Sequence, residues 1–176
     1  MLNTSFTLKK NVLLLLLPLL LSVQACGVYS LNGGSVGNLK TVNVLFFENV
    51  APLVINNLSQ NFTTALQDRI RNQTRLSTVR SDADATLEGR ITGYTIAPTV
   101  LPAANSTTAP IANTNRLTIT VSVKYTNSLD PKQSFEQSFS RFRDFQGDIS
   151  TQEQALIVDI NRQLTEDIFN RAFANW

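Results

Sequence analysis

The chain contains no histidine and only one cysteine in 176 residues. Without histidine it lacks the commonest general base and metal ligand. A single cysteine cannot form an intramolecular disulfide, so the fold must rely on packing alone. The sequence also has no glycine-rich phosphate loop before a helix and no group of carboxylates with metal-ligand spacing. We therefore predict no cofactor, no metal site and no enzymatic activity.

Two pairs of acids are the remaining candidates for catalysis. Asp82 with Asp84, or Glu88 with Asp144, could supply the two carboxylates that glycoside cleavage needs. Two acids in a strand-rich domain are far more often solvated surface charges. We therefore keep glycoside cleavage only as a minor alternative.

The charges do not indicate a nucleic-acid surface. The full chain has fifteen Lys and Arg residues against thirteen Asp and Glu residues. Two of the cations, Lys9 and Lys10, precede a long apolar run and would be removed with it by processing. Thirteen charges of each sign would remain, so the mature domain is predicted to be close to neutral.

The N-terminus has the pattern of an export signal. Two lysines precede the apolar run 12–23, which is shorter than the roughly 20 residues that span a bilayer. Ala25 and Cys26 follow, and this site resembles a lipobox, in which the cysteine sulfur is acylated, with palmitate for example. Val23 and Gln24 depart from that pattern. We predict a signal peptide over 1–25 and lipidation at Cys26; the alternative is an ordinary signal peptide followed by a chance cysteine.

The segment after Cys26 is rich in glycine and predicts a flexible tether over 26–38. No acidic run follows the cysteine, which favours the periplasm-facing side of a membrane. One domain is then expected over 39–176, a length that suits a single core. Lipid attached at Cys26 would keep this domain at its membrane.

Alternating and helical patterns predict the elements of this domain. Strands are expected over 39–47, 76–79, 83–97, 116–126 and 133–145, and the apolar run 44–47 is expected to be buried. A helix is expected to begin near an N-cap at Asn57, and a second after a capping box formed by Ser150 and Glu153. The fold class is α+β: a two-layer sandwich in which a mostly antiparallel sheet has two helices packed on one face.

Several local features carry more specific expectations. Gly89 and Gly93 fall on one face of their strand, which indicates a bulge or the close approach of another element such as a helix. Phe142 and Phe145 interrupt an alternation, which predicts a bulge or strand end near Arg141. The uncharged segment 98–115, which contains three prolines, predicts a long loop with no regular element, either a binding element or a disordered hairpin tip. Arginines 69, 71 and 75 either stabilise a helix C-terminus or recognise an anionic ligand.

The order of these features resembles the LptE family of lipopolysaccharide-assembly lipoproteins, in its divergent non-enteric branch. The resemblance extends over the whole mature chain and rests on the segments 26–30, 51–54, 58–63, 88–94, 115–121, 135–142, 167–172 and 175–176. It implies a small sheet with two helices on one face. It also implies an outer-membrane lipoprotein that occupies the lumen of the β-barrel protein LptD and helps to place lipopolysaccharide in the outer leaflet.

Within this interpretation, basic side chains on strands are candidates for contacts to lipopolysaccharide phosphates. The candidates are Arg90, Arg116, Lys124, Arg141 and Arg143. Ordinary solvated strand charges explain each of them equally well. The alternative function is a free-standing periplasmic lipoprotein that binds a small ligand or scaffolds another envelope complex.

Overall fold

The computed structural model describes residues 36–53, 55, 57–101 and 111–174. All of them belong to one compact unit that spans residues 32–176. The predicted signal peptide 1–25, the predicted lipidation site Cys26 and most of the predicted tether 26–38 lie outside the described residues. These three assignments therefore stay predictions.

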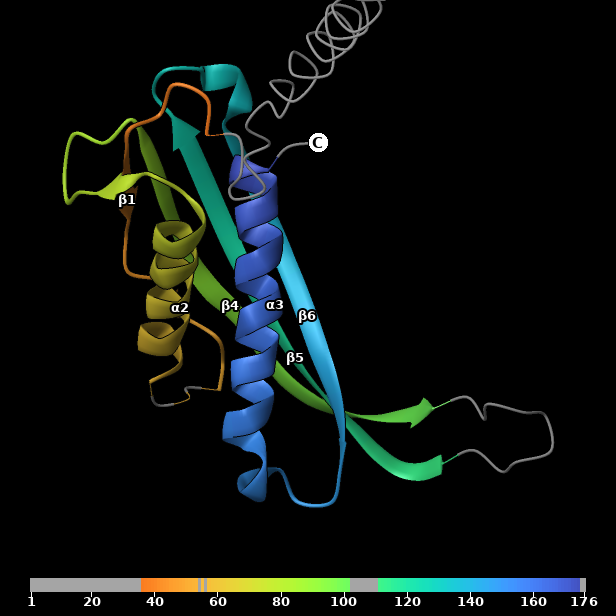
Figure 1. The fold of residues 1–176 in the computed structure, drawn as a ribbon. Helices are drawn as coiled ribbons and strands as arrows, with labels where there is room; N and C mark the ends of the chain where they lie inside the picture. Colours follow the sequence, from red (N-terminus) through yellow and green to blue (C-terminus); the bar gives the residue numbers. More distant parts are fainter. Residues whose placement is uncertain (1–35, 54, 56, 102–110, 175–176) are drawn as a thin grey trace, which may run out of the picture. The chain divides into compact units, whose positions relative to one another are not determined.

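The described strands form one mixed sheet (Figure 1). They are β1 (Thr41–Val44), β2 (Glu48–Asn49), β3 (Ser77–Thr78), β4 (Ala85–Leu101), β5 (Ile111–Asn127) and β6 (Phe135–Gln146). The order across the sheet is β3-β1-β4-β5-β6, and β2 pairs with β4. The long strands β4, β5 and β6 are antiparallel neighbours, whereas the short β1, β2 and β3 are joined in parallel.

Two helices, α2 (Leu58–Gln73) and α3 (Glu153–Phe173), lie side by side on one face of this sheet (Figure 1). The buried side chains of α2 are Leu58, Phe62, Thr63, Leu66 and Ile70. Those of α3 include Ile157, Ile160, Leu164, Ile168 and Phe169. The packing of both apolar stripes on one face of the sheet confirms the predicted two-layer α+β sandwich. No helix in the described part of the chain is both long and apolar enough to cross a membrane.

The two predicted helix caps are wrong in detail. Asn57 occupies the N-cap position of α2, but its φ is 63° and its side chain makes no capping bond. A short 3-10 helix, η3 (Ile149–Thr151), precedes α3, so Ser150 is not the N-cap of that helix. Glu153 instead accepts a hydrogen bond from the hydroxyl of Tyr94 at 2.7 Å. The acid predicted to close a capping box therefore ties the start of α3 to β4.

Arg69 joins the two helices to each other. Its guanidinium donates to the carbonyl of Arg162 at 3.0 Å and to the hydroxyl of Thr165 at 3.3 Å. Arg71 pairs with Asp68 one turn earlier on the same helix, at 2.6 Å. Arg71 lies in the last turn of α2, which agrees with the predicted stabilisation of the helix C-terminus. The contacts of Arg69 with α3 favour a structural role over a shared anion site.

The central strand β5 alternates cleanly between a helix-covered face and an uncovered face. Its buried residues are Leu117, Ile119, Val121, Val123 and Tyr125. The residues between them are Thr118, Thr120, Ser122, Lys124 and Thr126, which are half-buried or exposed. This alternation confirms the prediction of a sheet with one apolar face and one polar face.

β6 pairs with β5 in one uninterrupted register, so the bulge or strand end predicted near Arg141 is wrong. Three of its phenylalanines share the helix-covered face: Phe135, Phe139 and Phe145. Only Phe142 lies on the uncovered face, where 45% of it is exposed. Its ring packs against the guanidinium of Arg116 at 3.7 Å, which accounts for an aromatic residue on a polar face.

β4 contains a bulge at Thr92, where its register with β5 shifts between Ile91 and Gly93. Beyond the bulge the alternation reverses, so that Tyr94 joins the buried face. The predicted bulge is therefore confirmed. The prediction that Gly89 and Gly93 share a face is wrong, because Gly93 lies opposite Thr120 on the uncovered face.

Gly89 accommodates an aromatic ring rather than a helix. A Cβ at this position would lie 2.5 Å from a ring carbon of Phe47 and 2.2 Å from the carbonyl oxygen of Ser122. The Phe47 ring packs in turn on Phe62 of α2, with 5.1 Å between the ring centroids. The predicted close approach is thus real, but Phe47 makes it.

The connection from β1 to β2 carries one residue more than the stretch of β4 beside it. Val44 lies opposite Leu87 and Glu48 opposite Arg90, so three residues on one side face two on the other. The extra residue allows Phe47 to point into the core while the preceding pair points outward. Leu45 and Phe46 are 42% and 53% exposed, so the predicted burial of the run 44–47 is wrong for these two residues.

The segment 98–115 is not a loop throughout. β4 continues to Leu101 and β5 begins at Ile111, so the prediction of no regular element is wrong for 98–101 and 111–115. Pro98 is tolerated within a strand because β4 has no described partner strand on its outer side beyond Ile91. Residues 102–110 lie outside the described residues.

The chain enters the domain through a clamp at the start of β1. The carboxylate of Asp84 accepts hydrogen bonds from the backbone N–H groups of Lys40 and Thr41 at 2.8 and 2.9 Å. The backbone N–H of Asp84 donates in return to the hydroxyl of Thr41 at 2.9 Å. These bonds lower the pKa of Asp84, chiefly through the two backbone donors.

Candidate functional site

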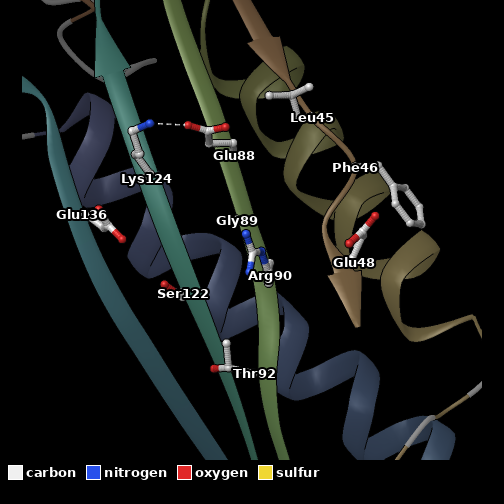
Figure 2. Close-up of a pocket in the computed structure, with 10 residues that line it drawn as sticks. All are labelled: Leu45, Phe46, Glu48, Glu88, Gly89, Arg90, Thr92, Ser122, Lys124 and Glu136. Carbon is white, nitrogen blue, oxygen red and sulfur yellow. Dashed lines mark hydrogen bonds and ion pairs between the residues drawn. The ribbon is translucent and has the colours of Figure 1, made fainter. Parts of the chain in front are cut away.

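The sheet face that the helices leave open is the best candidate site, and we call it the uncovered face. β4 contributes Glu88, Arg90 and Thr92 to it, β5 contributes Ser122 and Lys124, and β6 contributes Glu136 (Figure 2). Phe142 of β6 lies farther along the same face. Strand alternation places these side chains on one surface because residues two apart point the same way. The result is a polar surface with a few apolar side chains.

A groove of about 650 Å³ runs over this face between β2 and β6. It is lined by Leu45, Phe46, Glu48, Glu88, Gly89, Arg90, Thr92, Ser122, Lys124 and Glu136 (Figure 2). Acids and bases alternate along it, and two exposed apolar residues, Leu45 and Phe46, form one side. A groove of this size and mixed character can accept part of an amphiphilic molecule or a polypeptide segment.

Lys124 and Arg90 are the two cations of the groove, and they differ in their partners. The ammonium of Lys124 donates to Glu88 on the neighbouring strand at 2.7 Å, and this contact raises the pKa of Lys124. Arg90 is exposed and forms no ion pair with any described residue. An anion entering the groove would therefore meet Arg90 without first displacing a carboxylate.

A second basic position lies farther along the same face. The guanidinium of Arg116 binds both carboxylate oxygens of Asp144 on β6, at 2.7 and 3.0 Å. It also lies over the ring of Phe142. The ion pair lowers the pKa of Asp144 and holds the planar guanidinium in one orientation. Arg116 is thus largely committed to contacts within the protein.

Arg141 and Arg143 lie on the other side of the sheet. Arg141 reaches over to α3 and binds both carboxylate oxygens of Asp167, at 2.5 and 2.6 Å. Arg143 pairs with Asp159, also on α3. The structure therefore brings Arg90 and Lys124 together in the groove and places Arg116 farther along the same face. Arg141 and Arg143 are separated from all three.

Leu45, Phe46 and Phe142 are site residues that the sequence reasoning did not select. The runs in which they occur look like core, and an exposed aromatic has no sequence signal of its own. Leu45 and Phe46 are exposed because the chain has an extra residue before β2. Phe142 is exposed because its position in β6 places its side chain on the uncovered face. For Phe142 the odd spacing from its neighbours was a signal, although a bulge was the wrong explanation.

Three of the four acids considered for catalysis, Asp84, Glu88 and Asp144, make contacts within the domain. Asp84 holds the start of β1, whereas Glu88 and Asp144 pair with different cations on β5. No group of three potential metal ligands occurs among the described residues. The arrangement offers binding through charge and exposed apolar surface, without an acid pair poised for bond cleavage.

The profile of the family described as "LptE: Lipopolysaccharide-assembly" matches residues 39–172. Protein XCC0632 from Xanthomonas campestris is similar in fold, with a TM-score of 0.52 and 11% identity over 77% of this chain and 84% of that one. The hypothetical protein CT253 from Chlamydia trachomatis has a TM-score of 0.51 and 12% identity over 76% and 95%. At these identities the two structures show the fold alone. No curated protein sequence matches the chain significantly. Because the family profile covers most of its length, the chain belongs to the LptE lipopolysaccharide-assembly family.

Proposed function

We propose that this chain is an outer-membrane lipoprotein that occupies the lumen of the β-barrel protein LptD and assists lipopolysaccharide assembly. The family is a non-enzymatic one that acts in lipopolysaccharide assembly. The observation that carries the proposal is the family match over residues 39–172. The lipid anchor at Cys26, the periplasm-facing attachment and the barrel partner are further parts of the proposal.

The uncovered face suits a position inside a wide barrel. The interiors of large barrels are polar and hydrated. A domain whose polar sheet face lies toward the lumen wall would lose little solvation there, while its helices keep the apolar face covered. The exposed Leu45, Phe46 and Phe142 would provide local apolar contacts.

Arg90 is the first candidate for contact with a lipopolysaccharide phosphate, because it is exposed on the uncovered face and makes no described ion pair. Arg116 and Lys124 share this face, and each would have to exchange a carboxylate for a phosphate. Arg141 and Arg143 are paired with α3, which favours a structural role for them.

Co-purification tests the proposal directly. Extraction of membranes with a mild detergent, followed by isolation of the tagged lipoprotein, should recover a heat-modifiable barrel of much larger mass. Depletion of the lipoprotein should also reduce staining of lipopolysaccharide on the cell surface. A lipoprotein that purifies alone as a monomer under these conditions would contradict the barrel assignment.

The groove supports a second candidate, a free-standing periplasmic lipoprotein that binds a small ligand. Its volume of about 650 Å³ lies within the range of ordinary ligand sites. This alternative predicts a monomer that binds a small amphiphile with no barrel present, so the same purification separates the two functions.

A further inference from the structure

The outer edge of β4 is open in the part of the strand that extends past the helices. β2 pairs with β4 only as far as Ile91, and no described strand pairs with that side of β4 beyond it. Four consecutive residues, Thr95, Ile96, Ala97 and Pro98, are exposed, which means that both faces of the strand are accessible here. We call residues 93–97 the open edge.

The open edge lacks the charges that normally protect such a strand. The sequence has no Asp, Glu, Lys or Arg between Arg90 and Arg116, whereas β6, the edge strand on the other side of the sheet, carries acids and arginines. Exposed edges are usually blocked by lysines, prolines or bulges, because free N–H and C=O groups recruit other strands. Here a bulge at Thr92 and a proline at position 98 delimit an uncharged stretch of five residues, close to the length of an average strand.

The chemistry of the edge distinguishes between a lipid and a polypeptide as its partner. Hydrocarbon offers nothing to the free N–H and C=O groups of an edge, so open edges are not found against lipid chains. An added polypeptide strand satisfies these groups and also covers exposed side chains such as Ile96, which is 41% accessible. The absence of charge favours an uncharged partner segment.

We propose that the open edge of β4 receives an extended, uncharged segment of the barrel protein as an added β-strand. This inference rests on the proposed function, because it specifies how the barrel partner is held. The added strand pairs with residues 93–97 and ends at Pro98, which has no N–H to donate.

A charge-insertion pair tests this docking mode in the full lipoprotein. The variant Thr95→Lys/Ala97→Lys places two lysines on the open edge, and Thr126→Lys/Ser128→Lys places two at exposed positions with the same spacing near the other end of the sheet. The edge variant should recover at least about tenfold less barrel per lipoprotein, as expected for the loss of one or two main-chain hydrogen bonds. The control variant should recover nearly as much barrel per lipoprotein as the wild type does. Thermal melting should show that both variants fold.

Photo-crosslinking supplies a second measurement that does not depend on a disruptive variant. A benzophenone amino acid at position 97 should yield an adduct that maps to one extended, uncharged segment of the barrel protein. The same probe at position 126 should yield no adduct with that segment. Equal barrel recovery by the edge variant, or an adduct between two lipoprotein copies, would overturn the inference and leave the proposed function standing. A wild-type lipoprotein that brings no barrel would overturn both.

Discussion

Gly89 shows how one missing side chain sets the packing of three elements. Its backbone lies under the Phe47 ring, and that ring contacts Phe62 on α2. The bulky residue and the glycine are far apart in sequence, and neither alone indicates the contact. The sequence could flag Gly89 as a site of close approach, but only the register of β1 and β2 against β4 identifies Phe47 as the neighbour.

We expect Gly89→Ala to lower the free energy of unfolding by about 1–3 kcal/mol, the usual range for overpacking a tight core. The added Cβ would fall 2.2 Å from a backbone oxygen that cannot easily move. The control is Gly93→Ala, whose Cβ would meet only side-chain atoms of Thr120 within 3.4 Å, the nearest at 3.2 Å. Urea unfolding of the two variants measures the difference, and equal stabilities would refute the packing argument.

Arg90 and Arg141 provide a matched pair for lipopolysaccharide binding. Arg90→Ala removes the exposed cation of the groove and should weaken binding about tenfold, as for one charge-assisted hydrogen bond. Arg141→Ala breaks an ion pair with α3 and should leave binding within about twofold, because surface ion pairs contribute little even to stability. Binding of labelled lipopolysaccharide to the detergent-solubilised lipoprotein checks this. A larger loss in Arg141→Ala would move the site to the helix side.

At the scale of elements, the long strands and both helices follow from periodicity, whereas their ends and irregularities do not. The apolar stripes of α2 and α3 and the alternation of β5 are set by residues that all point into one core. At the start of α3, Glu153 accepts a hydrogen bond from the hydroxyl of Tyr94 on the distant strand β4, and a local capping motif cannot reveal this contact. The proline and small polar residues of 98–115 indicate a loop, but they are also compatible with an edge strand. The sequence therefore does not show that β4 continues to Leu101 and that β5 begins at Ile111.

The packing of α3 predicts a sharp contrast between two of its positions. Leu164 is fully buried, and Leu164→Ala should lower the free energy of unfolding by about 2–5 kcal/mol. Val158 lies on the same helix with 57% exposure, and Val158→Ala should change it by less than about 0.5 kcal/mol. Denaturant unfolding measures both. Similar losses at the two positions would mean that something covers the outer face of α3.

At the scale of the whole molecule, the candidate face could be predicted as polar, but its functional residues could be predicted only in part. The alternation of apolar and polar residues in β5 predicts that Lys124 lies on the face opposite the core. It does not show that Arg141 and Arg143 reach α3, because this depends on where the helix lies. The proposal of lipidation rests on the N-terminal pattern, and that of the barrel partner rests on the family.

The absence of histidine predicts a stability that is nearly independent of pH around neutrality. Asp144 has a lowered pKa because of Arg116. Its contribution to the free energy of unfolding is therefore present above pH 3.8 and is lost as the pH falls through the lowered pKa. Burial raises the pKa of Tyr125 to about 12, so its contribution is present below pH 10 and is lost as the pH rises toward 12. Urea midpoints should therefore be flat between about pH 5 and 9. A transition near pH 6 or 7 would contradict this.

Replacing Cys26 with Ser tests the attachment of the whole molecule to its membrane. Without the thiol no lipid can be attached, so the protein should either fail to be processed or appear in the soluble periplasmic fraction. Fractionation with antibody detection measures this, and Ser30→Ala serves as a control that leaves the thiol intact. Normal membrane recovery of Cys26→Ser would refute the lipid anchor.

The clamp at the entrance to β1 also has a mechanical consequence. If the proposed lipid anchor is present, tension directed along β1 would act between β3 and β4, which pair with it on either side. The load would then act in shear on several hydrogen bonds at once, including those of Asp84, and would not peel them apart one by one. The domain would thus resist tension applied at the end where the proposed lipid anchor is attached.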